Sequence, residues 1–285
     1  MTVRLLHTIA EVRAAHDEAR RAGRTVGLVP TMGYLHAGHA SLMDAARAEC
    51  GAVTATIFVN PLQFAANEDL STYPRDLDGD LALAEAHGVD VVFAPDVAEM
   101  YPSGPVLTTV SVRDLTATLD GASRPGHFDG VATVVAKLFA IAGTCRAYFG
   151  EKDYQQLLVV HRMAHDLSFP VTVVGCPTVR EPDGLAMSSR NVYLGPEDRA
   201  AAPVLKRCLD AGAAAVRAGE RSTDVIEATM TAVLAGEPRA TMDYVAAVDA
   251  RTLARPARLQ GEIRLLVAAR VGPARLIDNL GVHAD

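Results

Sequence analysis

The sequence predicts an α/β protein with a doubly wound parallel sheet, followed by a second, smaller α/β C-terminal domain. Through the first 180 residues, short β-branched runs alternate with segments in which apolar residues recur at helical spacing. This order is typical of βαβ units that stack on a parallel sheet. After Gly195 and Pro196 the composition changes to alanine-rich helical segments and then to strand-like runs. We therefore expect a Rossmann-like domain over residues 1–180 and a smaller domain over residues 181–285.

The individual elements follow from the same patterns. In the first domain, strands are expected at 25–29, 53–59, 89–94, 146–149 and 171–174. Apolar residues at helical spacing indicate helices over 42–50, 77–84, 131–141 and 154–167. In the second domain we expect helices over 197–218 and Thr223–Ala235, and strands at 242–248, 263–271 and 274–277. The polar segment 179–195 is interpreted as a hinge that carries functional groups at the domain junction.

Composition and charge exclude several classes of protein. The chain has 285 residues, of which 49% are hydrophobic, enough for one large core and a smaller one. Its 27 basic and 34 acidic residues give a formal charge of -7, which argues against a surface that neutralises nucleic-acid phosphates. No apolar run approaches the ~18 residues of a membrane span, and the charged N-terminus is unlike a signal peptide. We expect small-molecule partners, with no nucleic acid and no membrane.

The cysteines give no sign of a metal or redox site. Cys50, Cys145, Cys176 and Cys208 are far apart and form no C-x-x-C pair. Neither a zinc site nor a thioredoxin-like pair is indicated, and reduced thiols in a cytoplasmic protein are the simplest interpretation.

The first functional motif lies where the strand at 25–29 runs into VPTMGYLHAGH. His36 and His39 flank Gly38 at the start of a helix. Unpaired backbone N–H groups and the helix dipole favour phosphate there, and a histidine can donate to phosphate oxygens as charge builds on a leaving pyrophosphate. The four residues alone favour the plainer interpretation, two ordinary solvent-facing histidines on a loop. The strand-to-helix context favours a nucleotide site.

Four blocks in this order, VPTMGYLHAGH, IFVNPLQF, GEKDYQQL and DGLAMSSRN, resemble the motif set of the pantothenate synthetase family. The resemblance covers most of the first 195 residues and is weaker beyond them. It places the chain beside the nucleotidyltransferases and class I aminoacyl-tRNA synthetases that share an H-x-G-H motif. Residues 187–190 read Met-Ser-Ser-Arg where many of these relatives carry a lysine loop.

The resemblance implies an AMP-forming ligase. It implies that ATP activates pantoate as a pantoyl adenylate, and that the amine of β-alanine then attacks to give pantothenate, AMP and pyrophosphate. ATP is then a substrate, and Mg²⁺ is expected on its phosphates and waters rather than in a protein metal site. A homodimer is implied by the resemblance alone.

The same resemblance assigns site residues. The residues implied to bind ATP are Met32, Gly33, Tyr34, Leu35, His36, Ala37, Gly38, His39, Gly150, Glu151, Lys152, Asp153, Val179, Met187, Ser188, Ser189 and Arg190. Those implied to stabilise the leaving pyrophosphate are His36, His39, Lys152, Ser188, Ser189 and Arg190. Gln63 and Gln156 are implied to bind pantoate, and Gln63 to bind β-alanine as well.

Several of these residues have a plainer interpretation. Asn60 could form a simple Asn-Pro turn, and the Met-Ser-Ser-Arg segment could be a polar linker. Lys152 and Gln156 are expected on one helix face, while Asp153 could cap that helix or contact ribose or metal. Arg124 fits a substrate carboxylate and a helix-entry turn equally.

Other polar residues are assigned little function from the sequence. Tyr73 and His127 are left open between site and structure. The aspartates at 76, 78 and 80 are interpreted as a solvated helix start rather than a metal cluster. The histidines at 87, 161 and 165 are expected to be structural or on the surface.

The rival functions fall into two classes, other enzymes of the same superfamily and a non-catalytic nucleotide-binding protein. A cytidylyl- or adenylyltransferase would share the first motif but would not require IFVNPLQF and GEKDYQQL, and a tRNA synthetase would carry a basic appendage that is not visible here. A non-catalytic nucleotide sensor would not need His36, His39, Lys152 and Arg190 together, because it stabilises no leaving group.

Overall fold

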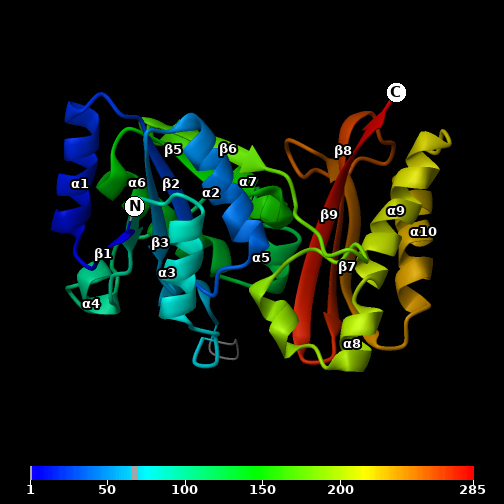
Figure 1. The fold of residues 1–285 in the computed structure, drawn as a ribbon. Coiled ribbons are helices and arrows are strands. Elements are labelled where there is room, and N and C mark those ends of the chain that lie inside the picture. Colours follow the sequence, from blue (N-terminus) through cyan, green and yellow to red (C-terminus); the bar gives the residue numbers. More distant parts are fainter. Residues whose placement is uncertain (1, 66–69) are drawn as a thin grey trace. The chain divides into compact units, whose positions relative to one another are not determined.

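The computed structural model describes residues 2–65 and 70–285, which form two compact units. The first comprises Met1–Glu151 and Gln156–Pro177, and the second comprises Lys152–Gln155 and Thr178–Asp285. One unit contains a six-stranded parallel sheet and the other a three-stranded antiparallel sheet (Figure 1). The predicted fold class is therefore confirmed. That residues 1–180 and 181–285 fold as independent domains stays a prediction.

The parallel sheet has the strand order β1-β4-β3-β2-β5-β6. Its strands are β1 (Arg4–Leu6), β2 (Val26–Thr31), β3 (Ala52–Ile57), β4 (Val91–Phe93), β5 (Cys145–Gly150) and β6 (Val171–Cys176). Five of them match predicted strands. The sixth, β1, was not predicted because three residues at a sheet edge show no measurable periodicity.

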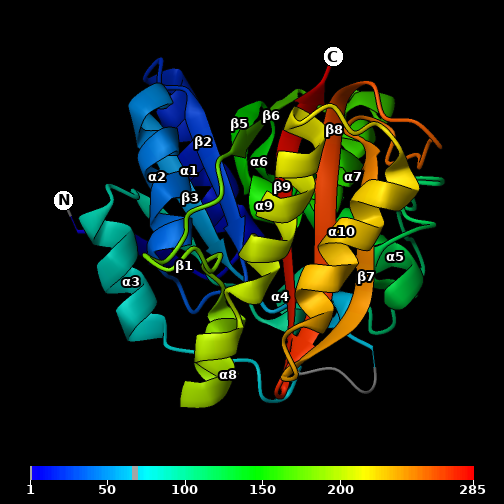
Figure 2. The ribbon, with the colours of Figure 1, turned by 90° about the vertical axis from the view of Figure 1, so that its right-hand side faces the viewer.

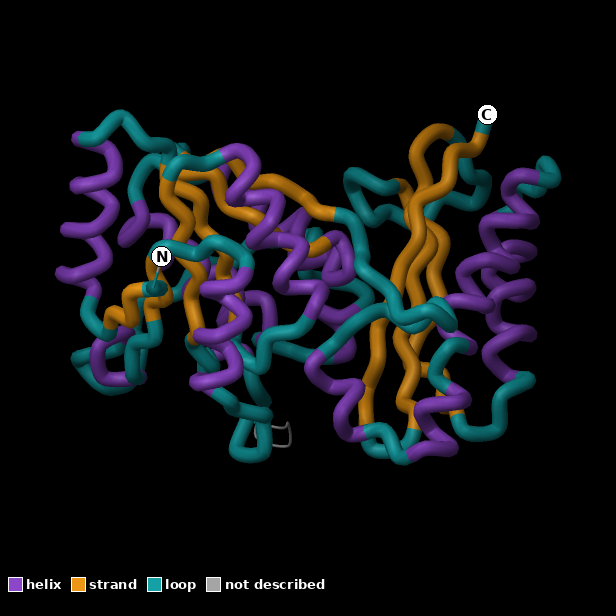
Figure 3. The backbone as a smooth tube through the Cα atoms, viewed as in Figure 1, coloured by secondary structure: helices purple, strands orange, loops and turns teal. Residues whose placement is uncertain are grey.

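Helices cover both faces of this sheet. The helices up to the end of α7 are α1 (Ile9–Arg21), α2 (Ala37–Glu49), α3 (Leu77–Ala86), α4 (Val97–Met100), α5 (Asp120–Ser123), α6 (His127–Ala142) and α7 (Tyr154–Asp166). Helices α1 and α6 pack together on one face, and α2 and α3 pack together on the other (Figures 1 and 3). The sheet is thus wound on both sides, as the alternating pattern predicted.

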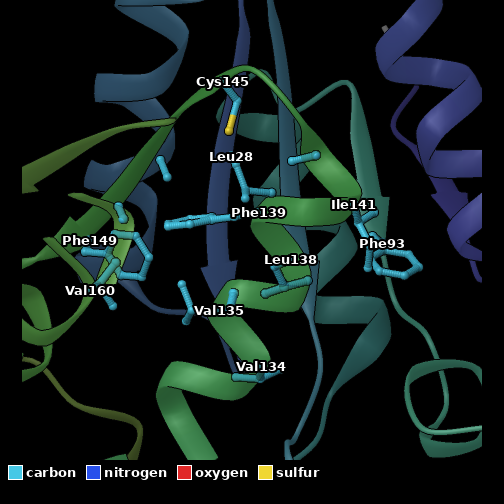
Figure 4. Packing of buried hydrophobic residues seen from close by; sticks show 14 of the residues in the cluster. Leu28, Phe93, Val134, Val135, Leu138, Phe139, Ile141, Cys145, Phe149 and Val160 are labelled. Atoms are coloured by element: carbon cyan, nitrogen blue, oxygen red, sulfur yellow. The ribbon is translucent and has the colours of Figure 1, made fainter. Parts of the chain in front are cut away.

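Alternation along the strands builds two cores. Val91 and Phe93 belong to the cluster under α1 and α6, whereas Val92 between them belongs to the cluster under α2 and α3. Successive strand side chains point to opposite faces, so an apolar run fills both cores. In the first cluster the ring of Phe139 lies edge-on to that of Phe149, with centroids 6.4 Å apart (Figure 4).

The second unit is an antiparallel meander with helices on one face. Its strands are β7 (Ala240–Asp249), β8 (Gly261–Val271) and β9 (Ala274–Ala284), and its helices are α8 (Pro196–Ala201), α9 (Val204–Arg217) and α10 (Thr223–Ala235). Figure 2 shows α9 and α10 over the sheet. The single helix predicted over 197–218 was wrong: it divides into α8 and α9 at Pro203, which has no N–H to continue the ladder.

Within residues 2–65 and 70–285, no helix is both long and apolar enough to cross a membrane.

A buried histidine makes the stability of the fold depend on pH. His16 is 2% exposed and its Nε2 lies 2.9 Å from Oγ1 of Thr54. Burial, assisted by the charge of Arg20, lowers the pKa of His16 to about 4. Because the unfolded chain takes up this proton near pH 6.5 and the folded chain does not, stability should fall as the pH drops from 6.5 towards 4.

The expected slope in that window is up to about 1.4 kcal/mol per pH unit from this residue. Urea unfolding at several pH values, compared between the natural protein and His16→Gln, measures it as a difference in slope. Identical pH dependence in the two proteins would contradict the burial of a neutral His16.

Candidate active site

The order of the parallel strands predicts where a ligand binds. From β2 the chain proceeds outward through β3 and β4, and from β5 it proceeds to β6 on the other side, so the direction reverses between β2 and β5. Ligands of open α/β sheets bind at the carboxyl ends of strands where this reversal occurs. The H-x-G-H segment follows β2 and Gly150 ends β5. Two motifs distant in sequence therefore start at neighbouring strand ends.

The two motif histidines cap helix α2 with their own side chains. His36 is the N-cap residue, and its Nδ1 accepts the Gly38 N–H at 3.1 Å. Nδ1 of His39 accepts the His36 N–H at 3.3 Å, and the ring centroids are 4.1 Å apart. An imidazole nitrogen that accepts a hydrogen bond carries no proton, so each neutral ring has its proton on Nε2. The fold thus selects the tautomer in which Nε2 is the donor.

The backbone amides before the helix are used internally. The Gly33 N–H donates to Oγ1 of Thr31 at 3.1 Å, and the N–H groups of Tyr34 and Leu35 donate to the carboxylate of Asp80 at 2.9 and 2.6 Å. These three amides, which precede the helix start, are therefore satisfied within the protein. The expectation that amides of the helix start itself bind a phosphate stays a prediction.

Gln63 lies against the first motif. Its Nε2 donates to Sδ of Met32 at 3.0 Å, and its Oε1 accepts from Nδ2 of Asn60 at 3.2 Å. Asn60 is 1% exposed and caps the 3₁₀ helix η1 (Pro61–Gln63), while its Oδ1 also accepts the hydroxyl of Tyr101 at 2.8 Å. The structure places Asn60 as the support of Gln63, beyond a simple turn.

Residues left open by the sequence lie around the same loop. Nδ1 of His127 donates to the Gln63 carbonyl oxygen at 2.9 Å, and its Nε2 accepts from Nη1 of Arg124 at 3.0 Å. Both residues are at the entry of α6, so they combine the helix-entry role with a contact to this loop. Tyr73 is buried with its ring 6.0 Å from that of Phe64.

In the second unit, the Lys152 segment is held by the C-terminal sheet. Lys152 and Asp153 lie in the 3₁₀ helix η2 (Glu151–Asp153), with Lys152 Nζ 3.7 Å from Oδ1 of Asp153. The Lys152 carbonyl oxygen accepts from Nδ2 of Asn279 at 2.7 Å, and the Arg264 guanidinium lies 3.8 Å from the ring centroid of Tyr154. Lys152 lies in the 3₁₀ turn directly before α7, which begins at Tyr154, and a shared face of Lys152 and Gln156 stays a prediction.

The segment expected to be a polar hinge contains a bridged turn. Arg180 pairs with Ala186 in an antiparallel bridge, and the Met187 N–H donates to the Val179 carbonyl oxygen at 3.0 Å. The Arg180 guanidinium binds both oxygens of buried Asp278 in β9, at 2.6 and 2.9 Å.

The Ser188–Arg190 stretch follows directly from this turn. Ser188 caps the 3₁₀ helix η3 (Ser189–Tyr193), because its Oγ accepts the Arg190 N–H at 3.2 Å. Ser189 is 9% exposed. Two hydroxyls and a guanidinium therefore start from a backbone that is anchored on β9.

Sequence reasoning missed the supporting residues. Asp80 was expected on a solvated helix start but is 3% exposed. Asn279 and Asp278 lay beyond the predicted end of the last strand. Each supports a motif from far along the chain, and only the fold reveals that pairing.

No group of three or more His, Cys, Asp or Glu side chains that could hold a metal ion occurs among residues 2–65 and 70–285.

Comparison with known proteins agrees over the whole chain. Residues 4–281 match the family model described as Pantoate-beta-alanine ligase. A relative named pantothenate synthetase from Roseiflexus sp. (strain RS-1) is 56% identical over 99% of this chain and 100% of its own. One from Heliobacterium modesticaldum is 54% identical over 99% of this chain and 100% of its own.

Solved structures give the same result. The crystal structure of pantothenate synthetase from Thermus thermophilus superposes with a TM-score of 0.93 at 52% identity, covering 99% of this chain and 100% of that one. A pantoate-beta-alanine ligase from Francisella tularensis, complexed with beta-gamma ATP and beta-alanine, gives 0.81 at 32% identity over 98% and 97%. With its nucleotide-binding topology and capped histidine pair, the chain is an α/β ligase. It belongs to the pantoate-β-alanine ligase family.

A glycine of α6 makes room for the Gln63 loop. A Cβ on Gly130 would lie 2.2 Å from the Leu62 carbonyl oxygen and 2.6 Å from the Gln63 nitrogen. Gly130→Ala should therefore push η1 away and lower the free energy of unfolding by about 1–3 kcal/mol. Urea unfolding measures this loss. Gly195→Ala is the matched control, since a Cβ there meets nothing within 4 Å. Equal stability of the two variants would contradict the close approach.

Proposed function

We propose that this chain joins pantoate to β-alanine at the expense of ATP, giving pantothenate, AMP and pyrophosphate through a pantoyl adenylate. Membership of the ligase family over residues 4–281 supports the reaction. The Francisella tularensis relative complexed with beta-gamma ATP and beta-alanine supports ATP and β-alanine as substrates. The observation that carries the site assignment is the pair of imidazoles whose Nδ1 atoms accept backbone N–H groups.

In the first step, an oxygen of the pantoate carboxylate attacks the α-phosphorus of ATP, and the bond to the bridging oxygen of pyrophosphate breaks. Negative charge then grows on the pyrophosphate. Nε2–H donors of His36 and His39 stabilise that charge without transferring a proton. This is preorganised electrostatic stabilisation, because the rings are oriented before the substrate arrives.

The remaining charge is met by cations and hydroxyls in the other motifs. Lys152 and Arg190 bind the β- and γ-phosphates, and the hydroxyls of Ser188 and Ser189 donate to their oxygens. The other ATP contacts are the segment Met32 to Gly38, with Gly150, Glu151, Asp153, Val179 and Met187. The Val179 carbonyl oxygen already accepts from Met187, so adenine contacts the Val179 N–H or the second lone pair of that oxygen.

In the second step, the amine of β-alanine attacks the pantoyl carbonyl carbon, AMP leaves, and the amine loses a proton as the amide forms. Gln63 binds pantoate and β-alanine, and Gln156 binds pantoate. A neutral amide offers two donors and an acceptor, and it holds a carboxylate without the strong attraction that would slow product release. Because Gln63 donates a hydrogen bond to Met32, the proposed site for pantoate and β-alanine adjoins the first ATP motif.

Mg²⁺ is proposed as the companion of ATP. The motifs offer two cationic side chains, hydroxyls and imidazoles, which suit the phosphates of ATP rather than Mg²⁺ itself. Mg²⁺ would then be coordinated by phosphate oxygens and waters. When bound, the ion neutralises phosphate charge. We further propose a homodimer in the cytoplasm. The four cysteines, all free, suit a reducing compartment.

Isotope exchange between ATP and pyrophosphate separates this function from its rivals. Exchange should require pantoate, and AMP should appear only after β-alanine is added. A nucleotidyltransferase with another acceptor would exchange when that acceptor is supplied in place of pantoate, and a nucleotide sensor would not exchange with any acceptor.

Replacement of a charge-stabilising residue tests the mechanism. His39→Ala and Lys152→Ala should each lower turnover about 100-fold or more. Stability should change much less, about 1 kcal/mol for the lost cap of α2 in His39→Ala. His165→Ala is the matched control, because the His165 side chain is 87% exposed. Steady-state kinetics and thermal unfolding are measured on the same samples. If turnover falls only to the extent that the variant is unfolded, the assigned roles are refuted.

A further inference from the structure

Asp80 is a buried carboxylate bound to the segment that precedes the motif histidines. It lies in the first turn of α3 and is 3% exposed. Its Oδ2 accepts the Tyr34 N–H at 2.9 Å and its Oδ1 accepts the Leu35 N–H at 2.6 Å. Both oxygens of one side chain therefore hold two successive amides from a segment more than forty positions earlier in the chain.

The segment that Asp80 holds has an unfavourable backbone. Gly33 has φ +85° and Tyr34 has φ +51°, so two consecutive residues lie in the left-handed region. A non-glycine residue in this region costs free energy and persists only where surrounding contacts fix it. A Cβ on Gly33 would lie 2.9 Å from Oδ2 of Asp80, which leaves space only for glycine. The carboxylate and the turn thus define each other's position.

Burial makes ionisation of Asp80 unfavourable. Burial is the largest influence and raises the pKa of Asp80, against the lowering effect of its bonds to Leu35 and Tyr34, and nearby Asp76 raises it further. In the described part of the chain, no lysine or arginine forms an ion pair with this carboxylate. A buried carboxylate without a cationic partner lowers the stability of the fold. Such a residue is typically retained where a functional site needs it.

We propose that Asp80 is a positioning residue of the ligase site: it fixes the turn at Gly33–Leu35 and thereby orients the imidazoles of His36 and His39 towards the phosphates of ATP. The connection is short, since His36 follows Leu35 directly and begins the cap of α2. The inference rests on the proposed contact of the histidines with ATP.

Asp80→Asn tests the proposal with almost no change in shape. Asparagine keeps one acceptor oxygen but turns an NH₂ group towards one of the two amides, so one hydrogen bond is lost. The expected result is a decrease in kcat/KM for ATP of about tenfold to 100-fold, because a small misplacement of the phosphate donors is amplified in the transition state. The KM for β-alanine should stay within about twofold, and the melting temperature should be unchanged or higher because the buried charge is gone.

The matched control is Asp78→Asn. It makes the same chemical change in the same helix turn, but Asp78 is exposed. Its kinetic constants should equal those of the natural protein. Amide hydrogen exchange supplies a readout that does not depend on activity: the Tyr34 and Leu35 amides should exchange at least about tenfold faster in Asp80→Asn and unchanged in Asp78→Asn.

Gly33→Ala provides a second route if Asp80→Asn folds poorly. It keeps the carboxylate but places a methyl group against it, and it should produce the same loss in kcat/KM for ATP. The role of Asp80 would be overturned if Asp80→Asn had the same kcat/KM for ATP as the natural protein, or if its Tyr34 and Leu35 amides exchanged no faster. Absence of pantoate-dependent exchange in the unsubstituted protein would instead contradict the proposed function, while faster amide exchange in Asp80→Asn would still support the hold on the turn.

Discussion

The self-capping of α2 by His36 and His39 is the interaction on which the candidate site depends. A helix start is usually capped by a serine, threonine, aspartate or asparagine, whose oxygen accepts a backbone N–H. Here Nδ1 of each imidazole accepts that bond instead. The cap satisfies the helix and at the same time selects the ring tautomer that presents Nε2–H. In the proposed function, one nitrogen of each ring serves local folding and the other serves phosphate chemistry.

Around the motifs, buried polar side chains form hydrogen bonds that hold other parts of the protein. Asn60 supports Gln63, Asp80 supports the turn before His36, and Asn279 binds the carbonyl oxygen of Lys152. Each lies far in sequence from what it supports, except Asn60, which is close to Gln63 but is itself held by Tyr101. A buried polar group is costly unless its hydrogen bonds are made, so these residues fix one geometry strongly. The precision of the site comes from this support, which the motif blocks reveal only in part.

This arrangement explains what the sequence could predict. Strands β2 to β6 and helix α10 follow from periodicity, and the motif blocks follow from local residue patterns. Pairing over long distance leaves no local pattern, so Asp80 was interpreted as solvated although it is 3% exposed. The same cause ended the last strand too early: Asp278 and Asn279 are polar, yet both continue the β8–β9 ladder opposite Val267 and Leu266. Tertiary partners there override the local preference for a turn.

In the proposed mechanism, the histidines and the cations make different contributions to catalysis. Lys152 and Arg190 would attract the phosphates of ATP before and during reaction alike, so much of their effect would be uniform binding, which lowers the free energy of ground and transition state together. A neutral Nε2–H gains strength chiefly when negative charge develops on the oxygen that it contacts. Its contribution is therefore largest in the transition state. A ring whose Nδ1 is engaged by its own helix cap is well suited to that task, because Nε2–H is then the donor, whereas a third cation in its place would mainly tighten the binding of ATP.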